Sequence, residues 1–326
     1  MHKVFVTARV LKQDDEAFAI LRENGCEIVP NPCYGRRLTE EELIQNIQGI
    51  DGLILGMEKV DAKVLAHADS LKVISRFGVG YDGVDVPAAT QKGIAVTNVP
   101  GQNTESVAEL ALGLMLAISR KIPTGWSLAK EGRWDIINGS ELKDKTLGIM
   151  GLGRIGKSVA QKAKGFQMKV LVYDRSANKK AEYCKENNIE IANSKEDLLA
   201  RSDYVSLHMP GTDELKNYIG AKELGMMKPT AFLINTARGE LVDEEALYNC
   251  LKEKGIAGAA LDDLASLPLQ KDNKLLTLEN AVITPHLGAN TYEANRRTKL
   301  MVMTNLLAGL TGKLNENVVN RDGLKK

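Results

Sequence analysis

The sequence has 326 residues, of which 44% are hydrophobic and 5% aromatic, so it is long enough for two domains that each bury a core. Its 43 basic and 42 acidic residues leave a net charge of +1, which argues against nucleic acid or an anionic membrane as a partner. With no run of roughly 20 apolar residues and an N-terminus typical of a strand rather than a secretion signal, we expect a cytoplasmic protein that acts on a small molecule.

The first third of the chain alternates short apolar runs with segments of helical period. The runs occupy residues 3–7, 26–30, 52–55, 72–75 and 94–98. Such alternation predicts a parallel sheet with helices on both faces. The segment 103–120 breaks this rhythm because it stays apolar at helical period over its whole length. It predicts a long, mostly buried helix that connects two domains.

A second series of strands follows. Its apolar runs are 146–150, 169–173, 203–208, 231–235, 256–262 and 281–285. This series predicts a second doubly wound unit of the α/β class. A further helix is expected over 289–309, and Val318 and Val319 near the C-terminus are placed to return to the first unit.

A glycine motif lies directly after the strand at 146–150. It reads Gly151-Leu152-Gly153-Arg154-Ile155-Gly156, and Asp174 ends the next strand. In a strand–loop–helix unit such glycines permit a tight turn and close approach to a pyrophosphate, which the helix N-terminus attracts. An acid at the end of the second strand accepts from the ribose hydroxyls and repels a 2′-phosphate. The motif therefore predicts NAD binding, with the adjacent Arg175 leaving NADP as an alternative.

Polar residues follow four strands of the second series, namely His208, Arg238, Asp262 and His286. Ligands of open parallel sheets bind at the carboxyl ends of the strands, where these residues meet. A guanidinium can grip a carboxylate and polarise a neighbouring carbonyl, and an imidazole can exchange a proton near neutral pH. Arg238 and His286 therefore predict hydride transfer to or from a 2-oxo acid. Taken singly, such a histidine is more often structural, and such an arginine can form a surface ion pair.

The sequence resembles the D-isomer-specific 2-hydroxyacid dehydrogenases, and most closely their phosphoglycerate dehydrogenase-like branch. The likeness runs from Lys3 to Asn320 and is carried by the stretches 76–85, 98–116, 139–156, 208–212, 233–247 and 285–291. We therefore expect two doubly wound parallel-sheet domains. One is a Rossmann-type NAD-binding domain at 100–290, and the other is a discontinuous, flavodoxin-like substrate-binding domain at 1–99 and 291–326.

The resemblance also implies roles for single residues. Arg238 would bind the substrate, and His286 would be the catalytic acid or base. The backbone N–H groups of Val79 and Gly80 would receive the substrate carboxylate, for which an ordinary strand-to-helix turn is the alternative. The cofactor would be contacted by Thr236, Ala237, Asp262 and Gly288 at the nicotinamide, by His208, Pro210 and Thr212 along its length, and by Asp174 at the ribose.

Two positions depart from the family pattern. Family members place a glutamate that bonds the catalytic histidine before the proline following the fifth strand of the second series, where this chain has Leu267. We expect either that His286 acts without a carboxylate to stabilise its cation, or that Asp263 partly substitutes. Relatives that use 3-phosphoglycerate carry an arginine where this chain has Gly56, although Arg76 matches another anion-contacting arginine or serves as a structural cation. The expected substrate is thus a short 2-hydroxy acid of the phosphoglycerate, hydroxypyruvate or glyoxylate class.

The apolar segments, the cysteine spacing and Leu267 bear on the assembly, the metal content and the alternative functions of the protein. The apolar helix from Asn103 and the arm through Trp126 and Trp134 predict a homodimer, since the resembling family uses this region as its dimer contact; packing of both tryptophans inside one chain is the alternative. The cysteines at 26, 33, 184 and 250 show no metal-ligand spacing, so we expect free thiols and no metal. Two rival functions are an NAD(H)-binding sensor resembling corepressors, which Leu267 favours, and an unrelated NAD-dependent reductase.

Overall fold

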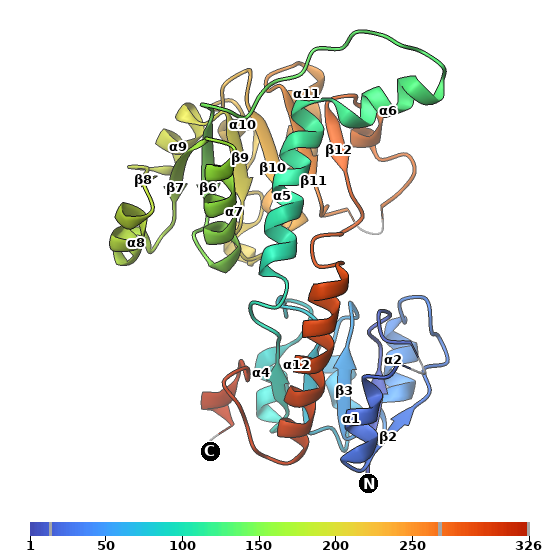
Figure 1. Cartoon of the computed structure of the whole chain (residues 1–326). Coiled ribbons are helices and arrows are strands. Elements are labelled where there is room, and N and C mark those ends of the chain that lie inside the picture. The colour runs from blue at the N-terminus through green and yellow to red at the C-terminus, as the bar shows by residue number, and fades with distance from the viewer. Residues whose placement is uncertain (13–14, 267–268, 325–326) are drawn as a thin grey trace. The chain divides into compact units, whose positions relative to one another are not determined.

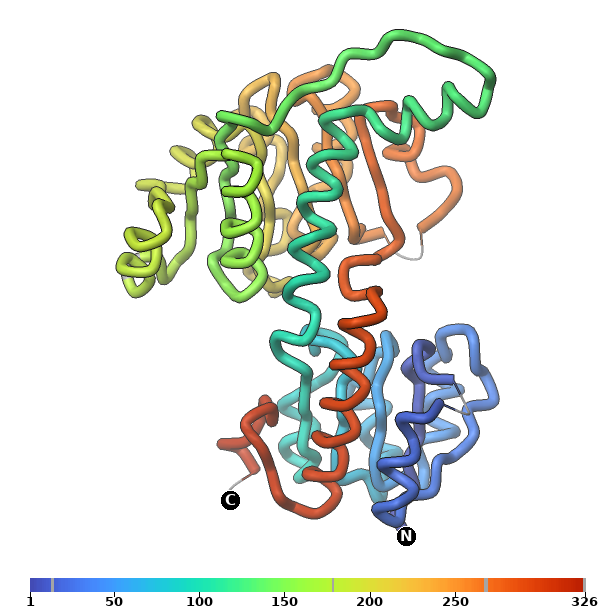
Figure 2. Tube along the Cα trace, viewed as in Figure 1, coloured from blue at the N-terminus to red at the C-terminus, as the bar shows by residue number. Residues whose placement is uncertain are grey.

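Parallel strands alternate with helices in the computed structural model, which describes residues 1–12, 15–266 and 269–324 (Figure 1). The chain forms two compact units, one made of Met1–Asn103 with Thr291–Lys326 and the other of Thr104–Asn290. The first unit therefore contains segments from both ends of the chain (Figure 2). Each unit is built on an open parallel sheet, so the α/β class predicted from the alternation of strands and helices is confirmed.

The first unit contains a five-stranded sheet in the order β2-β1-β3-β4-β5. Its strands are β1 (His2–Val6), β2 (Cys26–Val29), β3 (Gly52–Leu55), β4 (Val73–Arg76) and β5 (Ala95–Thr97). They coincide with the five predicted apolar runs. All four residues of the central strand β3 are buried, because helices cover both faces of a parallel sheet and leave neither side to water.

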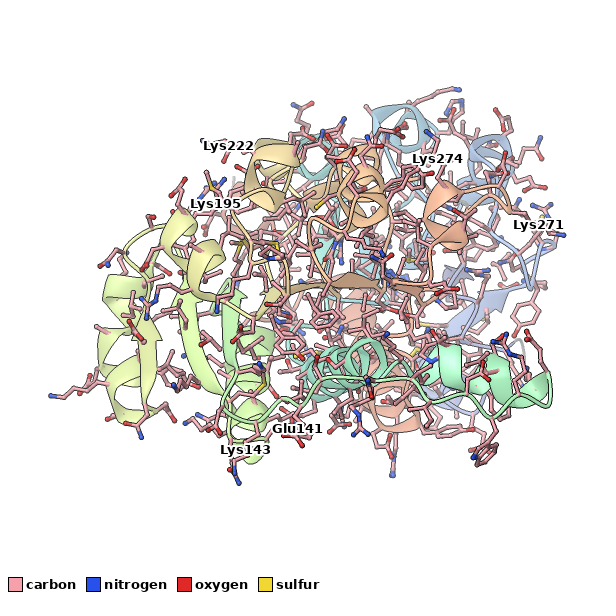
Figure 3. The ribbon with its side chains drawn as sticks, turned by 90° about the horizontal axis from the view of Figure 1, so that it is seen from above. Glu141, Lys143, Lys195, Lys222, Lys271 and Lys274 are labelled. Carbon is pink, nitrogen blue, oxygen red and sulfur yellow. The ribbon has the colours of Figure 1, made fainter. Side chains whose placement is uncertain are left out.

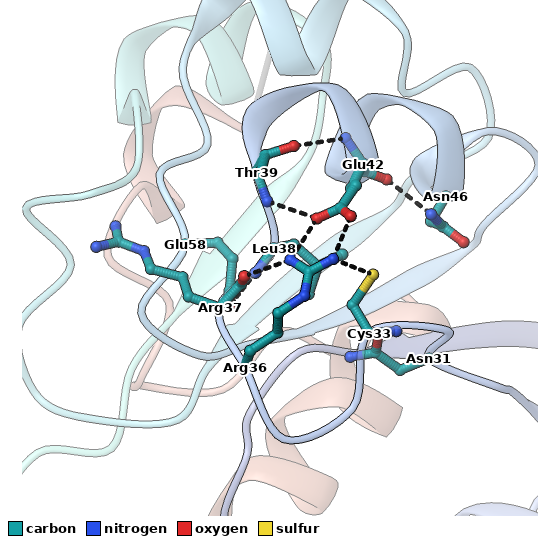
Figure 4. Close-up of polar contacts among 9 residues, drawn as sticks. All are labelled: Asn31, Cys33, Arg36, Arg37, Leu38, Thr39, Glu42, Asn46 and Glu58. Atoms are coloured by element: carbon teal, nitrogen blue, oxygen red, sulfur yellow. Dashed lines mark hydrogen bonds and ion pairs between the residues drawn. The ribbon is translucent and has the colours of Figure 1, made fainter.

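Helices cover this sheet. They are α1 (Phe18–Glu23), α2 (Glu40–Ile47), α3 (Ala62–Ala66), α4 (Val86–Gln91), α12 (Tyr292–Leu310) and the 3-10 turn η5 (Arg321–Gly323). Helix α2 begins with a capping box, in which the Thr39 hydroxyl accepts from the Glu42 N–H while the Glu42 carboxylate accepts from the Thr39 N–H. The same carboxylate pairs with Arg36, whose Nη2 lies 3.2 Å from Cys33 Sγ (Figure 4). This network fixes the start of α2.

Helix α12 returns the C-terminal part of the chain to the first sheet. Its Val302 carbonyl accepts a hydrogen bond from Ser75 Oγ at 2.9 Å, and Leu306 lies so close to Gly52 that a side chain there would begin 3.0 Å away. Beyond the helix, the Val319 N–H donates to the Val96 carbonyl at 2.8 Å. Both ends of the chain thus contribute to one core.

The second unit contains a seven-stranded sheet in the order β12-β11-β10-β9-β6-β7-β8. The strands are β6 (Thr146–Met150), β7 (Lys169–Tyr173), β8 (Ile189–Ile191), β9 (Tyr204–Leu207), β10 (Phe232–Asn235), β11 (Gly258–Leu261) and β12 (Ala281–Ile283). Six of these were predicted. The sequence did not reveal β8, because three residues with Glu190 in the middle give neither an apolar run nor a clear alternation.

The remaining elements of this unit are helices and 3-10 turns. They are α5 (Thr104–Ser119), α6 (Ile122–Lys130), α7 (Arg154–Gly165), η1 (Ala177–Lys180), α8 (Ala181–Glu186), α9 (Lys195–Arg201), η2 (Asp213–Leu215), α10 (Ala221–Leu224), η3 (Gly239–Leu241), α11 (Glu244–Lys252) and η4 (Lys274–Thr277). Charged residues such as Glu141, Lys143 and Lys222 are exposed at the outside of the unit (Figure 3). Within the described ranges, no helix combines the length and apolar composition needed to cross a membrane.

The long helix α5 belongs to the core of its own unit. Ala108, Ala111 and Met115 are completely buried in the core cluster that also contains residues of α7, β6 and β10. Most of its apolar surface is therefore already covered within one chain, which corrects the expectation that this helix adds to an exposed dimer surface. Several of the most exposed large apolar side chains of this unit lie instead in α6 and the segment that follows it.

The arm after α5 exposes four large apolar side chains. Their relative exposures are 55% for Ile122, 63% for Trp126, 95% for Trp134 and 95% for Ile136. The alternative in which both tryptophans pack inside one chain is therefore wrong.

Candidate active site

The loop between β6 and α7 carries the predicted glycine motif, and the structure gives each glycine a reason. Gly151 has a φ of +97°, and a side chain there would begin 2.4 Å from a carbonyl oxygen of the loop after β9. A side chain at Gly156 would begin 2.1 Å from the Gly151 oxygen. Gly153, the N-cap of α7, has no neighbouring described atom within 4 Å of its Cβ position, so its backbone is open to an anion. Arg154 and Ile155 then open the helix, the first exposed and the second packed on the core.

The carboxylate of Asp174, at the end of β7, accepts four hydrogen bonds. Its Oδ1 accepts from the N–H and the hydroxyl of Ser176 at 2.7 and 2.6 Å. Its Oδ2 accepts from the Leu152 N–H in the glycine loop and from Lys180 Nζ, both at 2.7 Å. Burial alone would raise the pKa of Asp174, but these donors hold it well below the usual range, so the side chain is ionised.

His208 follows β9 and is held by Ser206, whose Oγ lies 2.9 Å from the imidazole Nε2. Burial lowers the pKa of His208 to about 4, so the ring is neutral at pH 7. Its Nδ1 is buried and has no hydrogen-bond partner in the described part of the chain. The same loop continues through Pro210 and Thr212, both exposed, into η2.

Arg238 follows β10 in a loop whose backbone is hydrogen-bonded by the Asn235 side chain. The Asn235 side chain is completely buried, accepts from the Ala237 N–H at 3.0 Å and donates to the Arg238 carbonyl at 2.8 Å. The aliphatic part of Arg238 packs on the loop after β9, where a side chain at Gly211 would begin 2.7 Å from Arg238 Cγ. The guanidinium Nη1 donates to the Ala237 carbonyl at 2.7 Å. The hydrogen bonds of the loop backbone and the packing on Gly211 therefore fix the position of the Arg238 backbone and of the first part of its side chain.

Asp262, directly after β11, organises the loop that carries His286. Its Oδ1 accepts from the Thr284 hydroxyl at 2.6 Å and from the Leu287 N–H at 2.7 Å, while its Oδ2 accepts from the Gly288 N–H at 2.8 Å. Its carbonyl oxygen also accepts from the His286 N–H at 3.0 Å. This buried carboxylate holds the loop from 284 to 288 on both sides of the histidine.

His286 lies beside a second carboxylate. Its Nδ1 is 3.4 Å from Asp263 Oδ2, and the relative exposures of the two side chains are 42% and 10%. The other oxygen of Asp263 accepts from the Leu264 N–H at 3.0 Å. His286 also has a φ of +55°, a conformation that costs a residue with a side chain about 1–2 kcal/mol. The hydrogen bonds of Asp262 to this loop hold it there.

The strand register sets the spacing between the arginine and the histidine. Asn235, Leu261 and Ile283 are level on β10, β11 and β12. Arg238 and His286 each lie three residues beyond the level position of their strand (238 − 235 and 286 − 283). Their strands are separated by two strand spacings, which is about 10 Å. A short substrate placed between them can contact both.

In the first unit, the loop after β4 carries the residues predicted to bind the substrate. The N–H groups of Val79 and Gly80 donate no hydrogen bond within the residues that the structure describes. The loop is held by Asn98, whose side chain donates to the Val79 carbonyl at 2.8 Å. The Arg76 guanidinium turns back on this loop and donates to carbonyl oxygens at the ends of β3 and β4.

The chain is similar to known proteins over the residues that form this site. The family model described as "D-isomer specific 2-hydroxyacid dehydrogenase, NAD binding domain" matches residues 112–288. A D-3-phosphoglycerate dehydrogenase from Methanocaldococcus jannaschii is 43% identical over 98% of this chain, which spans 60% of that relative. A glyoxylate reductase from Thermofilum pendens is 40% identical over 99% of this chain and 96% of its own length.

The structure is also similar to solved structures of other proteins. An acyclic imino acid reductase, crystallised in complex with NADPH and D-Arg, superposes with a TM-score of 0.85 at 32% identity, covering 97% of this chain and 99% of its own. The chain belongs to the D-isomer-specific 2-hydroxyacid dehydrogenase family. The family resemblance stated from the motifs is confirmed, and with it the assignment to NAD-dependent oxidoreductases of 2-hydroxy and 2-oxo acids.

The described residues of this dehydrogenase fit a dinucleotide. Besides the open glycine loop, His208 Nδ1 and Thr236 Oγ1 are among the buried polar atoms at the strand ends that have no hydrogen-bond partner among the described residues. A buried polar atom left unpaired costs about 1–3 kcal/mol, so such atoms mark places where a ligand supplies the partner. Both belong to residues at which the family resemblance implies cofactor contact, and NAD is the cofactor of this family.

Sequence reasoning missed the residues that support the site. Asn235, Ser206, Ser176 and Lys180 each hold a predicted site residue through a side-chain hydrogen bond. A polar residue at the end of an otherwise apolar strand is a usable signal for Asn235, but no pattern marks the others. Leu267, on which the expected loss of the carboxylate rests, lies outside the described residues.

The described residues include no cluster of three or more His, Cys, Asp or Glu side chains placed to hold a metal ion.

Proposed function

We propose that this chain interconverts a short D-2-hydroxy acid and its 2-oxo acid, with glyoxylate or hydroxypyruvate as the class of oxo substrate. The proposal depends on the pair formed by His286 and Asp263. His286 lies as many residues beyond the end of its strand as Arg238 lies beyond the end of its own, at the same edge of the second sheet. The proposal is supported by the glycine loop at β6, which lies on the same edge. The names of the glyoxylate reductase and phosphoglycerate dehydrogenase relatives also support this substrate class.

Substrate binding is assigned to groups that favour an anion. In this proposal the Arg238 guanidinium grips the substrate carboxylate and polarises the neighbouring carbonyl, which a permanent charge does without a proton change. The family resemblance also assigns the substrate carboxylate to the N–H groups of Val79 and Gly80, which donate no hydrogen bond among the residues that the structure describes. Arg76 adds positive charge at the base of their loop.

Proton transfer is assigned to His286. Reduction of a carbonyl creates an alkoxide that needs a proton, and a positioned imidazolium supplies one in a step worth roughly 10²- to 10⁴-fold in rate. Asp263 Oδ2 lies 3.4 Å from Nδ1, which has no hydrogen-bond partner among the described residues, so this carboxylate is placed to orient the ring while Nε2 serves the substrate. In oxidation the same imidazole accepts the proton from the hydroxyl.

Cofactor binding is assigned to residues of the glycine motif and of the strand ends. NADH supplies the hydride when bound. The backbone around Gly153 receives the pyrophosphate, Asp174 the adenosine ribose, and the nicotinamide lies against the loops that carry Thr236, Ala237, Asp262 and Gly288. His208, Pro210 and Thr212 line the path between these two ends.

The test is a panel of 2-oxo acids with NADH, followed by loss of nicotinamide absorbance. The panel contains glyoxylate, hydroxypyruvate, pyruvate, 2-oxoglutarate and phosphohydroxypyruvate. We expect turnover with the short unphosphorylated acids, and a loss of roughly 10²- to 10⁴-fold in kcat for His286→Asn. His67→Asn, which changes an exposed histidine of the first unit, is the matched control and should match wild type. NADH binding without turnover of any acid would contradict the proposal and favour the sensor.

We further propose that the enzyme is a cytoplasmic homodimer that contacts its partner through the arm of α6. The exposed Trp126 and Trp134 support the dimer, and the four free cysteines are typical of a reducing compartment. Sedimentation at micromolar concentration tests the assembly, and a single monomeric species contradicts it. A Trp134→Glu variant should weaken the dimer, whereas Tyr292→Glu, at an exposed aromatic of the first unit, should not.

A further inference from the structure

The direction of the Gly80 N–H is set by a hydrogen bond on the opposite side of its peptide unit. The Val79 carbonyl and the Gly80 N–H belong to one planar peptide unit, so they point in opposite directions. The Val79 carbonyl accepts from Asn98 Nδ2 at 2.8 Å. Because glycine adopts backbone conformations that other residues avoid, this peptide unit turns at little cost once the bond is lost. Asn98 therefore orients the Gly80 N–H without contacting it.

Asn98, directly after β5, is held at both of its backbone groups. Its N–H donates to the Asn317 carbonyl at 3.2 Å, and its carbonyl accepts from Asn305 Nδ2 at 2.8 Å. Asn305 lies on α12 and is 1% exposed, and Asn317 belongs to the segment that follows this helix. The C-terminal part of the chain thus fixes the residue that orients the loop after β4.

The side-chain amide of Asn305 can face Asn98 only with its nitrogen. Its Oδ1 accepts from Asn315 Nδ2 at 2.9 Å and from Asn317 Nδ2 at 3.0 Å, which uses both lone pairs of this oxygen. The Asn317 N–H donates to Asn315 Oδ1 at 3.1 Å and closes the turn between these two residues. The two asparagines after α12 therefore fix the orientation of Asn305.

The segment 315–320 is also hydrogen-bonded along β5. Asn320 Oδ1 accepts from the Val96 N–H at 2.9 Å, and Asn320 Nδ2 donates to the Ile94 carbonyl at 2.9 Å. Because β5 is an edge strand of the first sheet, this segment covers backbone groups that no other strand pairs. The asparagines that hold Asn305 are thus part of a fixed segment.

We propose that Asn98 and Asn305 are positioning residues, which act by orienting the Gly80 N–H toward the substrate carboxylate. This inference rests on the role that the proposed function gives to Val79 and Gly80. In this proposal neither asparagine contacts the substrate, because both act through the backbone. A carboxylate held by an oriented N–H is bound alike in the ground state and in the transition state, so loss of the orientation raises KM and leaves kcat nearly unchanged.

Steady-state kinetics with glyoxylate and NADH test the inference. Asn98→Ala removes the donor to the Val79 carbonyl, and we expect KM for glyoxylate to rise by about tenfold or more, with kcat and the dissociation constant of NADH changed by less than about twofold. Asn305→Ala should act in the same direction. A double variant that combines both changes should have about the KM of Asn98→Ala alone, because both changes act on the same peptide unit.

Asn46→Ala is the matched control. The Asn46 side chain also donates to a backbone carbonyl of the first unit, that of Glu42 on α2, at 2.7 Å. Denaturant unfolding of all variants measures what each change costs in stability. The inference is overturned if Asn98→Ala raises KM no more than the control does, if it weakens NADH binding by the same factor, or if the two single effects on KM multiply in the double variant.

Failure of the proposed function looks different, because wild type would then turn over no oxo acid. Calorimetric titration with oxalate in the presence of NADH takes the place of kinetics in that case, since oxalate also presents a carboxylate next to a second carbonyl carbon. We expect Asn98→Ala to bind oxalate about tenfold more weakly than wild type and Asn46→Ala to bind it as wild type does. Equal binding by wild type and Asn98→Ala, or no binding by wild type, overturns the inference.

Discussion

Asp263 and His286 face each other across adjacent loops, with Asp263 Oδ2 3.4 Å from the imidazole Nδ1. The carboxylate is largely buried and its second oxygen accepts from the Leu264 N–H, so it is fixed in place. The chain therefore has a carboxylate beside its histidine even though the family position for that carboxylate is occupied by Leu267.

The first prediction concerns this pair. Asp263→Asn removes the charge and keeps the shape, so the imidazolium loses its stabilising partner. We expect kcat for oxo-acid reduction at pH 7 to fall by about tenfold or more. Because reduction needs the protonated imidazole, the pH at which kcat declines should move to lower values. The measurement is the pH profile of kcat under saturating NADH.

Two further variants make this prediction specific. Asp263→Glu retains a carboxylate and should recover part of the rate together with the position of the pH profile. Leu267→Glu adds the family carboxylate, and it should raise the rate and move the profile to higher pH. A profile that does not move in Asp263→Asn would show that Asp263 has a structural role only.

The second prediction concerns the packing of Arg238. A methyl group at Gly211 would begin 2.7 Å from Arg238 Cγ, so Gly211→Ala must displace the arginine stem. Misplacement of a positioning group by about 1 Å can cost 10²-fold, and we expect kcat/KM for the oxo acid to fall by at least about tenfold. Gly113→Ala is the control. It lies on α5 with no described neighbour within 4 Å of its Cβ position, and it should leave kcat/KM unchanged.

The parts of the fold that are encoded locally were predictable from the sequence. Buried parallel strands are apolar on both faces, so they appear as short apolar runs, and the glycine motif identified the cofactor loop because close packing excludes any side chain at Gly151 and Gly156. The short edge strand β8 has no such run, and it forms because β7 offers it an open edge.

The support of the site was not predictable, because it joins residues that are distant in sequence. Asp262 bonds residues 22 to 26 positions away, and Lys180 reaches Asp174 only through the geometry of η1. The motifs named Arg238 and His286 as reactive groups from their chemistry. Only the strand register gives their separation, since it depends on the pairing of β10, β11 and β12.

The third prediction concerns the loop that carries His286. Asp262→Asn replaces one acceptor oxygen by an amide that donates, which then faces a hydroxyl or an N–H group of the 284–288 loop. An unsatisfied buried donor costs about 1–3 kcal/mol, and the loop should open locally. We expect faster amide exchange at Leu287 and Gly288 together with a lower kcat. Thr284→Val removes one hydrogen bond only, so its effect should be smaller, and equal exchange in wild type and Asp262→Asn would refute this role.

The last prediction concerns His208 and acid stability. A free histidine titrates near pH 6.5, whereas burial lowers the pKa of His208 to about 4 in the folded protein. Between these values the unfolded chain binds a proton that the folded protein does not bind. The contribution of this neutral histidine is therefore complete above about pH 6.5 and is lost as the pH falls towards 4.

The size of the effect follows from the two titrations. From pH 7 to pH 5 the folded protein should lose about 2 kcal/mol of unfolding free energy through His208 alone. His208→Asn cannot take up this proton, so its unfolding free energy should fall by about 2 kcal/mol less over the same range, whatever its value at pH 7. Denaturant unfolding of both proteins at the two pH values measures the difference. Equal losses in wild type and variant would mean that His208 is protonated in the fold, and that its imidazole is accessible to water.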